Sequence, residues 1–268
     1  MQNVQLKDQM GRTVVLKQPI SRIICLNPSQ TETLIALGLE EEVLGVTKFC
    51  VHPSHLRKTK TIVGGTKKVD FEKIRKLNPD IVLCNKEENT QEIVETLEKE
   101  FPVHVTDVSN LQDALEMLKQ YGQLFNRTKK AEELSSKILS EKNQFDKFIK
   151  TKTKKRVAYF IWQNPYMVTG KDTFIHHMLE MNGFENVFAQ HDRYPTTNLE
   201  ELSNLSLDHV LLSSEPFPFK EIHQKELQQK LGMDVKLVDG EYFSWYGSRL
   251  LGAFQYFRSL HGDGTPLL

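Results

Sequence analysis

Short apolar runs alternate with longer amphipathic stretches along the first part of the chain. The apolar runs have the length of β-strands, and the stretches between them place apolar residues at helical spacing. Strands are predicted over residues 13–16, 22–26, 43–46, 81–84 and 103–105, and helices from residue 29 or 31 to 37 and over 71–77 and 90–99. Residues 49–60 are polar and are predicted to form a loop. Strands that alternate with helices predict a parallel sheet with right-handed crossovers.

Polar residues mark the ends of these helices. Ser29 followed by Glu32 matches a capping box, and Asp70 is suited to accept hydrogen bonds at the start of the helix over 71–77. Gly38 and the Asn78-Pro79 pair are predicted to end the two helices.

The middle of the chain carries two helices in succession, over residues 110–124 and 126–151. The second is long and unusually polar, which is typical of a helix that bridges two domains, with an ordinary surface helix as the alternative. The α/β pattern then restarts, with strands over 156–161, 210–213 and 235–238 and helices over 173–181, 199–205, 220–231 and 249–260. The predicted organisation is an α/β lobe (1–125), a connecting helix (126–152) and a second α/β lobe (153–268), with the tail GDGTPLL frayed.

Charge and composition exclude several classes of protein. Lys+Arg and Asp+Glu both number 35, whereas a nucleic-acid-binding protein usually has a basic excess. No apolar run approaches the roughly 18 residues of a membrane span. The N-terminal residues lack the apolar segment of a signal peptide. The chain is therefore expected in the cytoplasm if Met1 is its native start, and in the periplasm or at the cell surface if an export sequence was removed.

The three cysteines do not form the even-numbered set of a disulfide framework. Cys25 and Cys84 lie in strand-like runs and are predicted to be buried as small apolar residues. Cys50 lies in a loop, where a ligand contact is an open alternative.

Several motifs, in their order along the chain, resemble one family of transport proteins. The first lobe contains RIICLNPSQTETLIALG, GVT and FEKIRKLNPDIVL, and the second contains YFIWQNPYMVTGKDTFIHHMLEMNGFENVF. Together they are similar to the cobalamin and iron-siderophore substrate-binding proteins of ABC importers. The resemblance implies two Rossmann-like lobes joined by one long backbone helix, as in class III periplasmic binding proteins. It also implies a monomeric receptor without cofactor or catalysis, which binds a metal chelate between its lobes and delivers it to an ABC permease and its ATPase. Cobalamin or another corrinoid, a ferric siderophore and haem are the candidate chelates.

The residues themselves point to the loops after the strands. Ligands of open α/β sheets bind at the carboxyl ends of the strands. The loops expected there are residues 27–30, 48–52, 64–68, 85–88, 162–166, 192–196, 214–217 and 240–247. Several are rich in aromatic residues, which suit a broad and partly apolar ligand, although a core role for each ring is the alternative.

The candidate ligand-binding residues combine aromatic contacts with polar groups that fix orientation: Phe49, Cys50, His52, Lys67, Trp162, Arg193, Tyr194, Glu241, Tyr242, Phe243, Trp245, Tyr246 and Arg249. The resemblance places Phe49, Trp162 and Tyr194 at aromatic ligand contacts. It places Glu241 at a carboxylate contact of the cobalamin binder. Thr66 and Trp245 depart from the cobalamin pattern and leave the chelate open. The metal is expected to arrive inside its chelator, with at most one axial contact from His52 or His191.

The resemblance also implies one surface glutamate on each lobe that pairs with arginines of the permease. Glu72 and Glu200 fall at these positions. Each is in the first turn of a predicted helix, where the helix dipole favours a carboxylate, so a local role is the alternative.

Three other functions stay open. A receptor for bare zinc or manganese needs converging ligands, but the nine histidines are scattered, and His176 and His177 point apart on a helix. An enzyme on two α/β lobes is disfavoured because no P-loop, GxGxxG, GxSxG or HExxH motif is present. A cytoplasmic protein that handles cobalamin or haem is consistent with the missing export signal.

Overall fold

The computed structural model describes residues 3–262 and divides into two compact units. Unit 1 comprises Met1–Val108, Gln112–Lys137 and Tyr246–Arg249, and unit 2 comprises Ser109–Leu111, Ile138–Trp245 and Leu250–Leu268. The long helix α6 (Thr128–Ile149) contributes to both units. The predicted fraying of the C-terminal tail concerns residues that lie, beyond Gly262, outside the described range.

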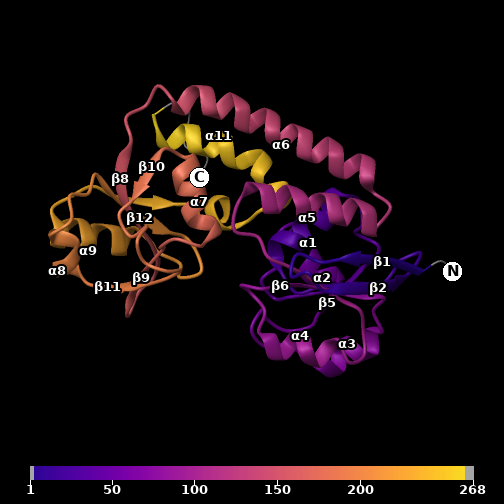
Figure 1. The fold of residues 1–268 in the computed structure, drawn as a ribbon. Coiled ribbons are helices and arrows are strands. Elements are labelled where there is room, and N and C mark those ends of the chain that lie inside the picture. Colours follow the sequence, from indigo (N-terminus) through magenta and orange to yellow (C-terminus); the bar gives the residue numbers. More distant parts are fainter. Residues whose placement is uncertain (1–2, 263–268) are drawn as a thin grey trace. The chain divides into compact units, whose positions relative to one another are not determined.

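Unit 1 is built on a five-stranded sheet in the order β5-β4-β3-β6-β7 (Figure 1). Its strands are β3 (Ile23–Cys25), β4 (Val43–Val46), β5 (Thr61–Ile62), β6 (Ile81–Asn85) and β7 (Val103–Thr106). Its helices are α1 (Pro28–Ala36), α2 (Leu56–Thr59), α3 (Phe71–Leu77), α4 (Gln91–Leu97) and α5 (Leu111–Leu124), and a hairpin of β1 (Asn3–Lys7) and β2 (Thr13–Lys17) precedes them. All neighbouring strands of the five-stranded sheet run parallel, so their carboxyl ends meet at one edge.

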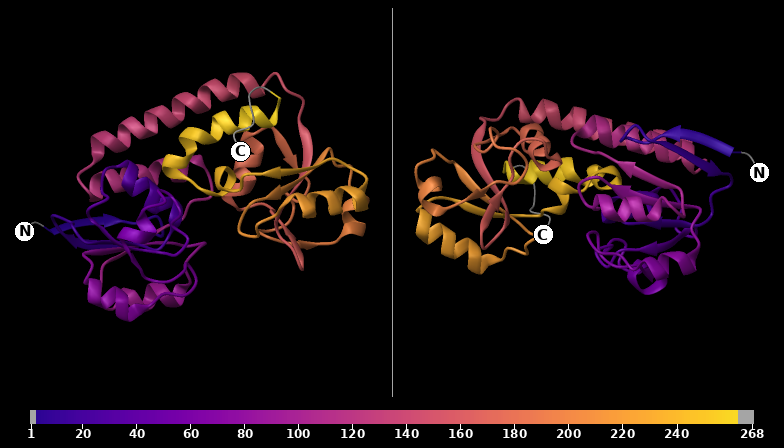
Figure 2. Two further views of the ribbon diagram at one scale, coloured as in Figure 1. Left: turned by 180° about the vertical axis from the view of Figure 1, so that it is seen from behind. Right: turned by 60° about the horizontal axis from the view of Figure 1, so that its bottom comes forward.

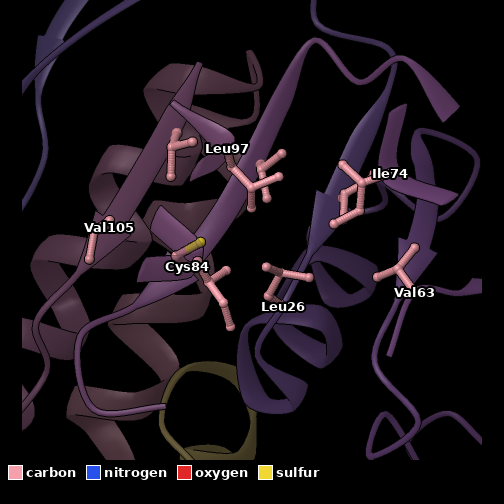
Figure 3. Packing of buried hydrophobic residues seen from close by; sticks show 10 residues of the cluster. Leu26, Val63, Ile74, Cys84, Leu97 and Val105 are labelled. Atoms are coloured by element: carbon pink, nitrogen blue, oxygen red, sulfur yellow. The ribbon is translucent and has the colours of Figure 1, made fainter. Parts of the chain in front are cut away.

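Apolar side chains of α3 and α4 cover one face of this sheet. Ile74 of α3 and Leu97 of α4 belong to one buried cluster with Leu26, Cys84 and Val105 (Figure 3). Helices α1 and α5 lie on the opposite face (Figure 1). Both faces of the sheet are therefore covered, which explains why the central strands β3 and β4 and the first four residues of β6 are apolar.

Unit 2 has a mixed sheet in the order β11-β9-β8-β12-β13, with β10 paired to the start of β8. Figure 2 shows the strands of this unit, coloured salmon to orange, from two further sides. Its strands are β8 (Lys155–Trp162), β9 (Tyr166–Val168), β10 (Phe184–Asn186), β11 (Thr196–Thr197), β12 (His209–Ser213) and β13 (Val235–Val238). Its helices are α7 (Phe174–Met181), α8 (Leu199–Ser203), α9 (Glu221–Leu231), α10 (Glu241–Ser244) and α11 (Leu250–Leu260). Strands β8, β10, β12 and β13 are parallel, whereas β9 runs antiparallel to its neighbours. The α/β fold class predicted from the sequence is confirmed.

Aromatic side chains pack between the helices and the unit-2 sheet. The ring of Tyr159 lies 5.1 Å from that of Phe243, which in turn lies 4.9 Å from Phe257. Phe145, in the second half of α6, lies 5.8 Å from Phe254. These rings join α6, α10 and α11 to β8, so the second half of the long helix belongs to the core of unit 2.

The structure corrects several local expectations. The predicted capping box is wrong, because Asn27 caps α1 and accepts a hydrogen bond from the Gln30 N–H at 3.0 Å. The extended backbone of Asn27 and the fixed φ of Pro28 place the start of the helix earlier. One-turn helices, α2 and α10, occupy two segments that were expected to be loops. The short strands β1, β5, β9, β10 and β11 were not predicted, since pairing with neighbours stabilises them more than their own sequence does.

Candidate ligand-binding surfaces

Phe49 is an exposed aromatic ring at the carboxyl edge of the unit-1 sheet. It lies in the loop after β4, and 47% of its surface is accessible. The backbone of Gly65 lies beneath the ring, since a Cβ at residue 65 would come within 3.2 Å of the Phe49 Cε2 atom. The Lys48 ammonium lies 5.0 Å from the ring centre. The ring is therefore held on a glycine turn and presents an apolar surface beside a positive charge.

Asn89 ties together three loops at this edge. Its side-chain amide donates to the carbonyls of Thr66 at 2.9 Å and Leu26 at 3.3 Å, and its Oδ1 accepts from the Asn85 N–H at 2.8 Å. Buried hydrogen bonds of a side-chain amide fix the loops that they connect. Asn89 was not among the predicted residues; the only sequence signal is a polar residue shortly after a buried strand.

Glu88 is a carboxyl group at the same edge that sequence reasoning did not single out. Burial, and secondly the nearby charge of Glu87, raise its pKa, while Lys67 and a hydrogen bond with the Thr66 side chain oppose that rise. A partly buried carboxyl group next to an exposed ring is a typical polar group of a ligand site.

The other predicted residues of unit 1 differ in their accessibility. Cys50 is fully buried, and its thiol donates a hydrogen bond to the hydroxyl of Thr31, with 3.3 Å between sulfur and oxygen. Lys67 is exposed, and its ammonium donates to the Glu87 carbonyl at 2.5 Å. His52 is half-buried in the same loop as Phe49. Cys50 thus has the environment of a core residue, as have Cys25 and Cys84, whose predicted burial is confirmed.

Trp162 is the exposed aromatic ring of unit 2. It ends β8, and 40% of its surface is accessible. Phe217, in the loop after β12, packs edge-to-face against it with ring centres 5.6 Å apart. Phe217 in turn contacts Phe219 at 4.7 Å. The carboxyl ends of two adjacent strands therefore carry a joined aromatic surface, of which only Trp162 was predicted as a ligand contact.

Residues 241–244 of the aromatic-rich loop predicted at 240–247 form α10, and Trp245 directly follows this helix. Phe243 is fully buried, and Trp245 is 7% accessible. The indole N–H of Trp245 donates to Glu215 at 2.9 Å. Tyr242 stacks on Tyr256 of α11 with ring centres 4.7 Å apart. Most of the aromatic density of this loop thus contributes to the core.

Tyr246 and Arg249 lie in unit 1, in contact with α1. The Tyr246 hydroxyl accepts a hydrogen bond from the Gln30 side chain at 3.1 Å, and the Arg249 guanidinium pairs with Glu32 at 2.9 Å. A Cβ at Gly247 would lie 2.1 Å from the Thr33 hydroxyl, so the backbone contacts the helix directly. We call residues 246–249 the α1 clasp. Arg249 belongs to a 3₁₀ turn before α11 and not, as expected, to the first turn of that helix.

Residues 192–195 lie between β10 and β11, and Thr196 begins β11. This segment pairs with the residues after β9, where the Gly170 N–H donates to the Arg193 carbonyl at 2.6 Å. Because β9 is antiparallel to β8, this pairing lies toward the middle of β8, away from Trp162. The exposed Arg193 lies 5.7 Å from the Tyr194 ring, and their ligand contacts stay a prediction.

Glu72 and Glu200 are both exposed in the first turn of a helix, α3 and α8. Glu72 accepts a hydrogen bond from Arg75 at 2.6 Å, and Arg75 also pairs with Glu100. Asp70 caps α3 as predicted. A docking partner would therefore compete with Arg75 for Glu72. The Glu72–Arg75 ion pair is exposed and hence weak.

Neither a metal centre nor a membrane-spanning helix occurs within residues 3–262. No group of three or more His, Cys, Asp or Glu in residues 3–262 is arranged to hold a metal ion. No helix in the same range has the length and apolarity needed to cross a bilayer.

An α/β unit with a parallel sheet, an α/β unit with a mixed sheet and a long helix that contributes to both are the fold of a class III periplasmic binding protein. A family model described as periplasmic binding protein matches residues 23–234. The chain belongs to this family of substrate-binding components of ABC transporters. Members of the family are binding proteins and not enzymes. The family resemblance found in the sequence is confirmed.

Relatives and solved structures agree with this assignment. The chain is 28% identical over 217 residues to the uncharacterized ABC transporter substrate-binding lipoprotein YvrC of Bacillus subtilis, covering 78% of this chain and 68% of that protein. It is 24% identical to a vitamin B12-binding protein of Pectobacterium carotovorum, covering 87% and 86%. A periplasmic heme-binding protein from Pseudomonas aeruginosa has the same fold, with a TM-score of 0.81, 20% identity and coverage of 93% and 95%.

Proposed function

We propose that this protein captures a metal chelate with its strand-end loops and delivers it to an ABC permease. The observation that carries the proposal is an accessible aromatic ring at the carboxyl edge of each sheet, Phe49 in unit 1 and Trp162 in unit 2. Flat rings suit the broad face of a corrinoid, a haem or an aromatic siderophore. Similarity to vitamin B12-binding and heme-binding proteins supports this ligand class.

The metal of such a ligand would be held by its chelator. The described residues bring together no set of metal ligands, so recognition would rest on ring contacts and a few polar groups. In unit 1 these are Lys48, Lys67 and Glu88, and in unit 2 Phe217 extends the surface of Trp162. The ligand would be cargo and not a cofactor.

Titration with cyanocobalamin, haemin, a ferric hydroxamate and a ferric catecholate tests the ligand class. Both tryptophans lie in unit 2, so quenching of their fluorescence reports binding. Absorbing chelates quench both indoles by energy transfer, and Trp162, the accessible one, can also be quenched by contact. Trp162→Phe should remove the contact part of the quenching. The absence of saturable binding of all four chelates at micromolar concentration would contradict the proposal.

Alanine variants then locate the surface. Loss of one aromatic contact is worth up to about 1.5 kcal/mol, or roughly tenfold in affinity. Phe49→Ala and Trp162→Ala should each weaken binding by about this factor. Val15→Ala is the control, because Val15 is 54% accessible on β2, which is not a strand of the parallel sheet. Equal affinity of all three variants would remove these rings from the site.

Delivery to a permease is tested separately. Uptake of the identified chelate should fall in Glu72→Gln/Glu200→Gln while chelate affinity stays unchanged. Glu41→Gln/Glu133→Gln removes the same charge from two other exposed positions and should leave uptake intact. Unchanged uptake in the first variant would exclude these two glutamates as docking residues.

A further inference from the structure

Lysines accompany the exposed Phe49 ring in the strand-end loops of unit 1. Lys48 precedes Phe49 in the loop after β4, and Lys67 and Lys68 lie in the turn after β5. All three lysines are exposed, as is the ring. We call Phe49, Lys48, Lys67 and Lys68 the basic surface of unit 1.

Backbone hydrogen bonds hold the two loops of the basic surface together. The Lys48 N–H donates to the Gly64 carbonyl at 2.8 Å, and the Gly65 N–H donates to the Lys68 carbonyl at 2.8 Å. Gly64 has a φ of 125°, and a Cβ there would lie 2.6 Å from the Lys68 carbonyl oxygen, so this turn requires glycine. A Cβ at Gly65 would lie 3.5 Å from the Lys48 Cε atom and 3.2 Å from the Phe49 ring. The backbone of the lysines is therefore fixed beside the ring.

The ammonium groups of Lys48 and Lys67 contact neutral groups. The Lys48 ammonium lies 5.0 Å from the centre of the Phe49 ring, and that of Lys67 donates to the backbone carbonyl of Glu87 at 2.5 Å. Each ammonium group carries several N–H donors, so each can donate to a further acceptor. A ligand that stacks on the Phe49 ring would bring its rim to the Lys48 ammonium.

The carboxylates of the neighbouring loops are less accessible than these lysines or are already engaged. Glu87 and Glu88 are half-buried after β6. Burial raises the pKa of Glu88, which disfavours its charged form, although the positive charge of Lys67 opposes this rise. Asp107 is in an ion pair at 2.6 Å, and Asp70 caps α3. Positive charge is therefore the more accessible charge beside the Phe49 ring.

We propose that the basic surface selects a chelate with negative charge at its rim, which pairs with Lys48, Lys67 and Lys68. This inference rests on the proposed function and narrows its ligand class. The ring would hold the apolar part of the chelate, and charge-assisted hydrogen bonds to its rim are roughly twice as strong as neutral ones. The propionates of haem and the oxygens of a ferric catecholate offer this charge, whereas cyanocobalamin and a neutral ferric hydroxamate carry no net charge.

Chelates that differ in charge but little in shape provide the test on the full chain. Haemin is compared with its dimethyl ester, and cyanocobalamin with its monocarboxylate; a ferric catecholate and a neutral ferric hydroxamate complete the set. The anionic member of a pair should bind about tenfold more tightly than the neutral one, and added salt should reduce this preference. Binding of haemin or of the catecholate distinguishes the two sources of charge.

The outcomes separate this inference from the proposed function. A neutral chelate that binds as tightly as its anionic counterpart would overturn the selection by charge and leave the proposed function intact. Binding of the neutral hydroxamate alone would do the same. Absence of binding to every chelate would overturn both.

Matched variants locate the selection. Lys48→Gln/Lys67→Gln should weaken binding of the anionic chelate by about tenfold and leave that of its neutral counterpart unchanged. Lys76→Gln/Lys99→Gln is the control, because it removes the same charge from exposed residues that precede β6 and β7, at the amino-terminal edge of the same sheet. Equal affinity of the two double variants for the anionic chelate would overturn the inference. Lys48→Gln keeps the bond from Lys67 to Glu87 and should weaken binding even if the first variant folds poorly.

Discussion

Replacing Tyr246 with phenylalanine separates two roles for the α1 clasp. The sequence suggests a ligand contact, whereas the structure places the hydroxyl in a buried network with Gln30. Gln30 also donates to the Thr106 hydroxyl at 2.6 Å and accepts from the Tyr121 hydroxyl at 2.7 Å. All four side chains belong to unit 1 and are 5% accessible or less.

The magnitude follows from the partners that remain. In Tyr246→Phe the Gln30 amide keeps its bond to Thr106, and the Thr106 and Ser29 hydroxyls, which also bond to Tyr246, keep their bonds to Cys84 and Asn27. No buried acceptor is left without a donor, so the expected loss of unfolding free energy is about 1 kcal/mol. In Tyr121→Phe the buried Gln30 carbonyl loses the donor at 2.7 Å. An acceptor left unsatisfied costs more, about 2 kcal/mol. Tyr246→Phe should therefore be the milder variant, and neither should change chelate affinity.

Denaturant unfolding followed by far-UV circular dichroism is the suitable assay. Both tryptophans lie in unit 2, so their fluorescence would miss a change confined to unit 1. The reasoning is refuted if Tyr246→Phe costs more than Tyr121→Phe. It is refuted also if Tyr246→Phe weakens chelate binding without changing stability, which would make Tyr246 a ligand contact.

Three further outcomes are expected. Gly170→Ala should lower the free energy of unfolding by about 3 kcal/mol or prevent folding, because a Cβ there would lie 2.2 Å from the His191 carbonyl oxygen. Thermal unfolding measures this loss, and an unchanged midpoint would refute the clash. Asp70→Ala should cost about 1 kcal/mol in chemical denaturation through loss of the α3 cap, whereas Asp70→Asn should be nearly neutral. Burial lowers the pKa of His104 in the folded chain below its ordinary 6.5. As the pH falls, the unfolded chain is therefore protonated at His104 before the folded chain is. The stability present above pH 6.5 is lost as the pH falls below that value. His104→Gln should flatten this part of the pH–stability curve, and an unaltered curve would show that other groups cause it.

The sequence by itself determined the elements whose signals are local. Strands β4 and β13 and helix α3 begin and end where their patterns predict, and Asp70 caps α3. Burial of both sheet faces makes β4 a continuous apolar run, and β13 is apolar except for Lys236. A cap acts on the next turn of its own helix. Family membership followed from the order of these local motifs. Phe49 and Trp162 were also predicted at strand ends, where the structure places them exposed.

Only the tertiary structure decided which aromatic residues are accessible. Phe217 meets Trp162 because β8 and β12 are neighbours in the sheet, and Tyr246 meets Gln30 across 216 positions of sequence. From the sequence alone, the aromatic run at residues 242–246 suggests a ligand-binding surface. In the structure, most of these rings are buried in the core. Local periodicity reports which side of an element is apolar; it does not report what covers that side, because the covering residues come from distant parts of the chain.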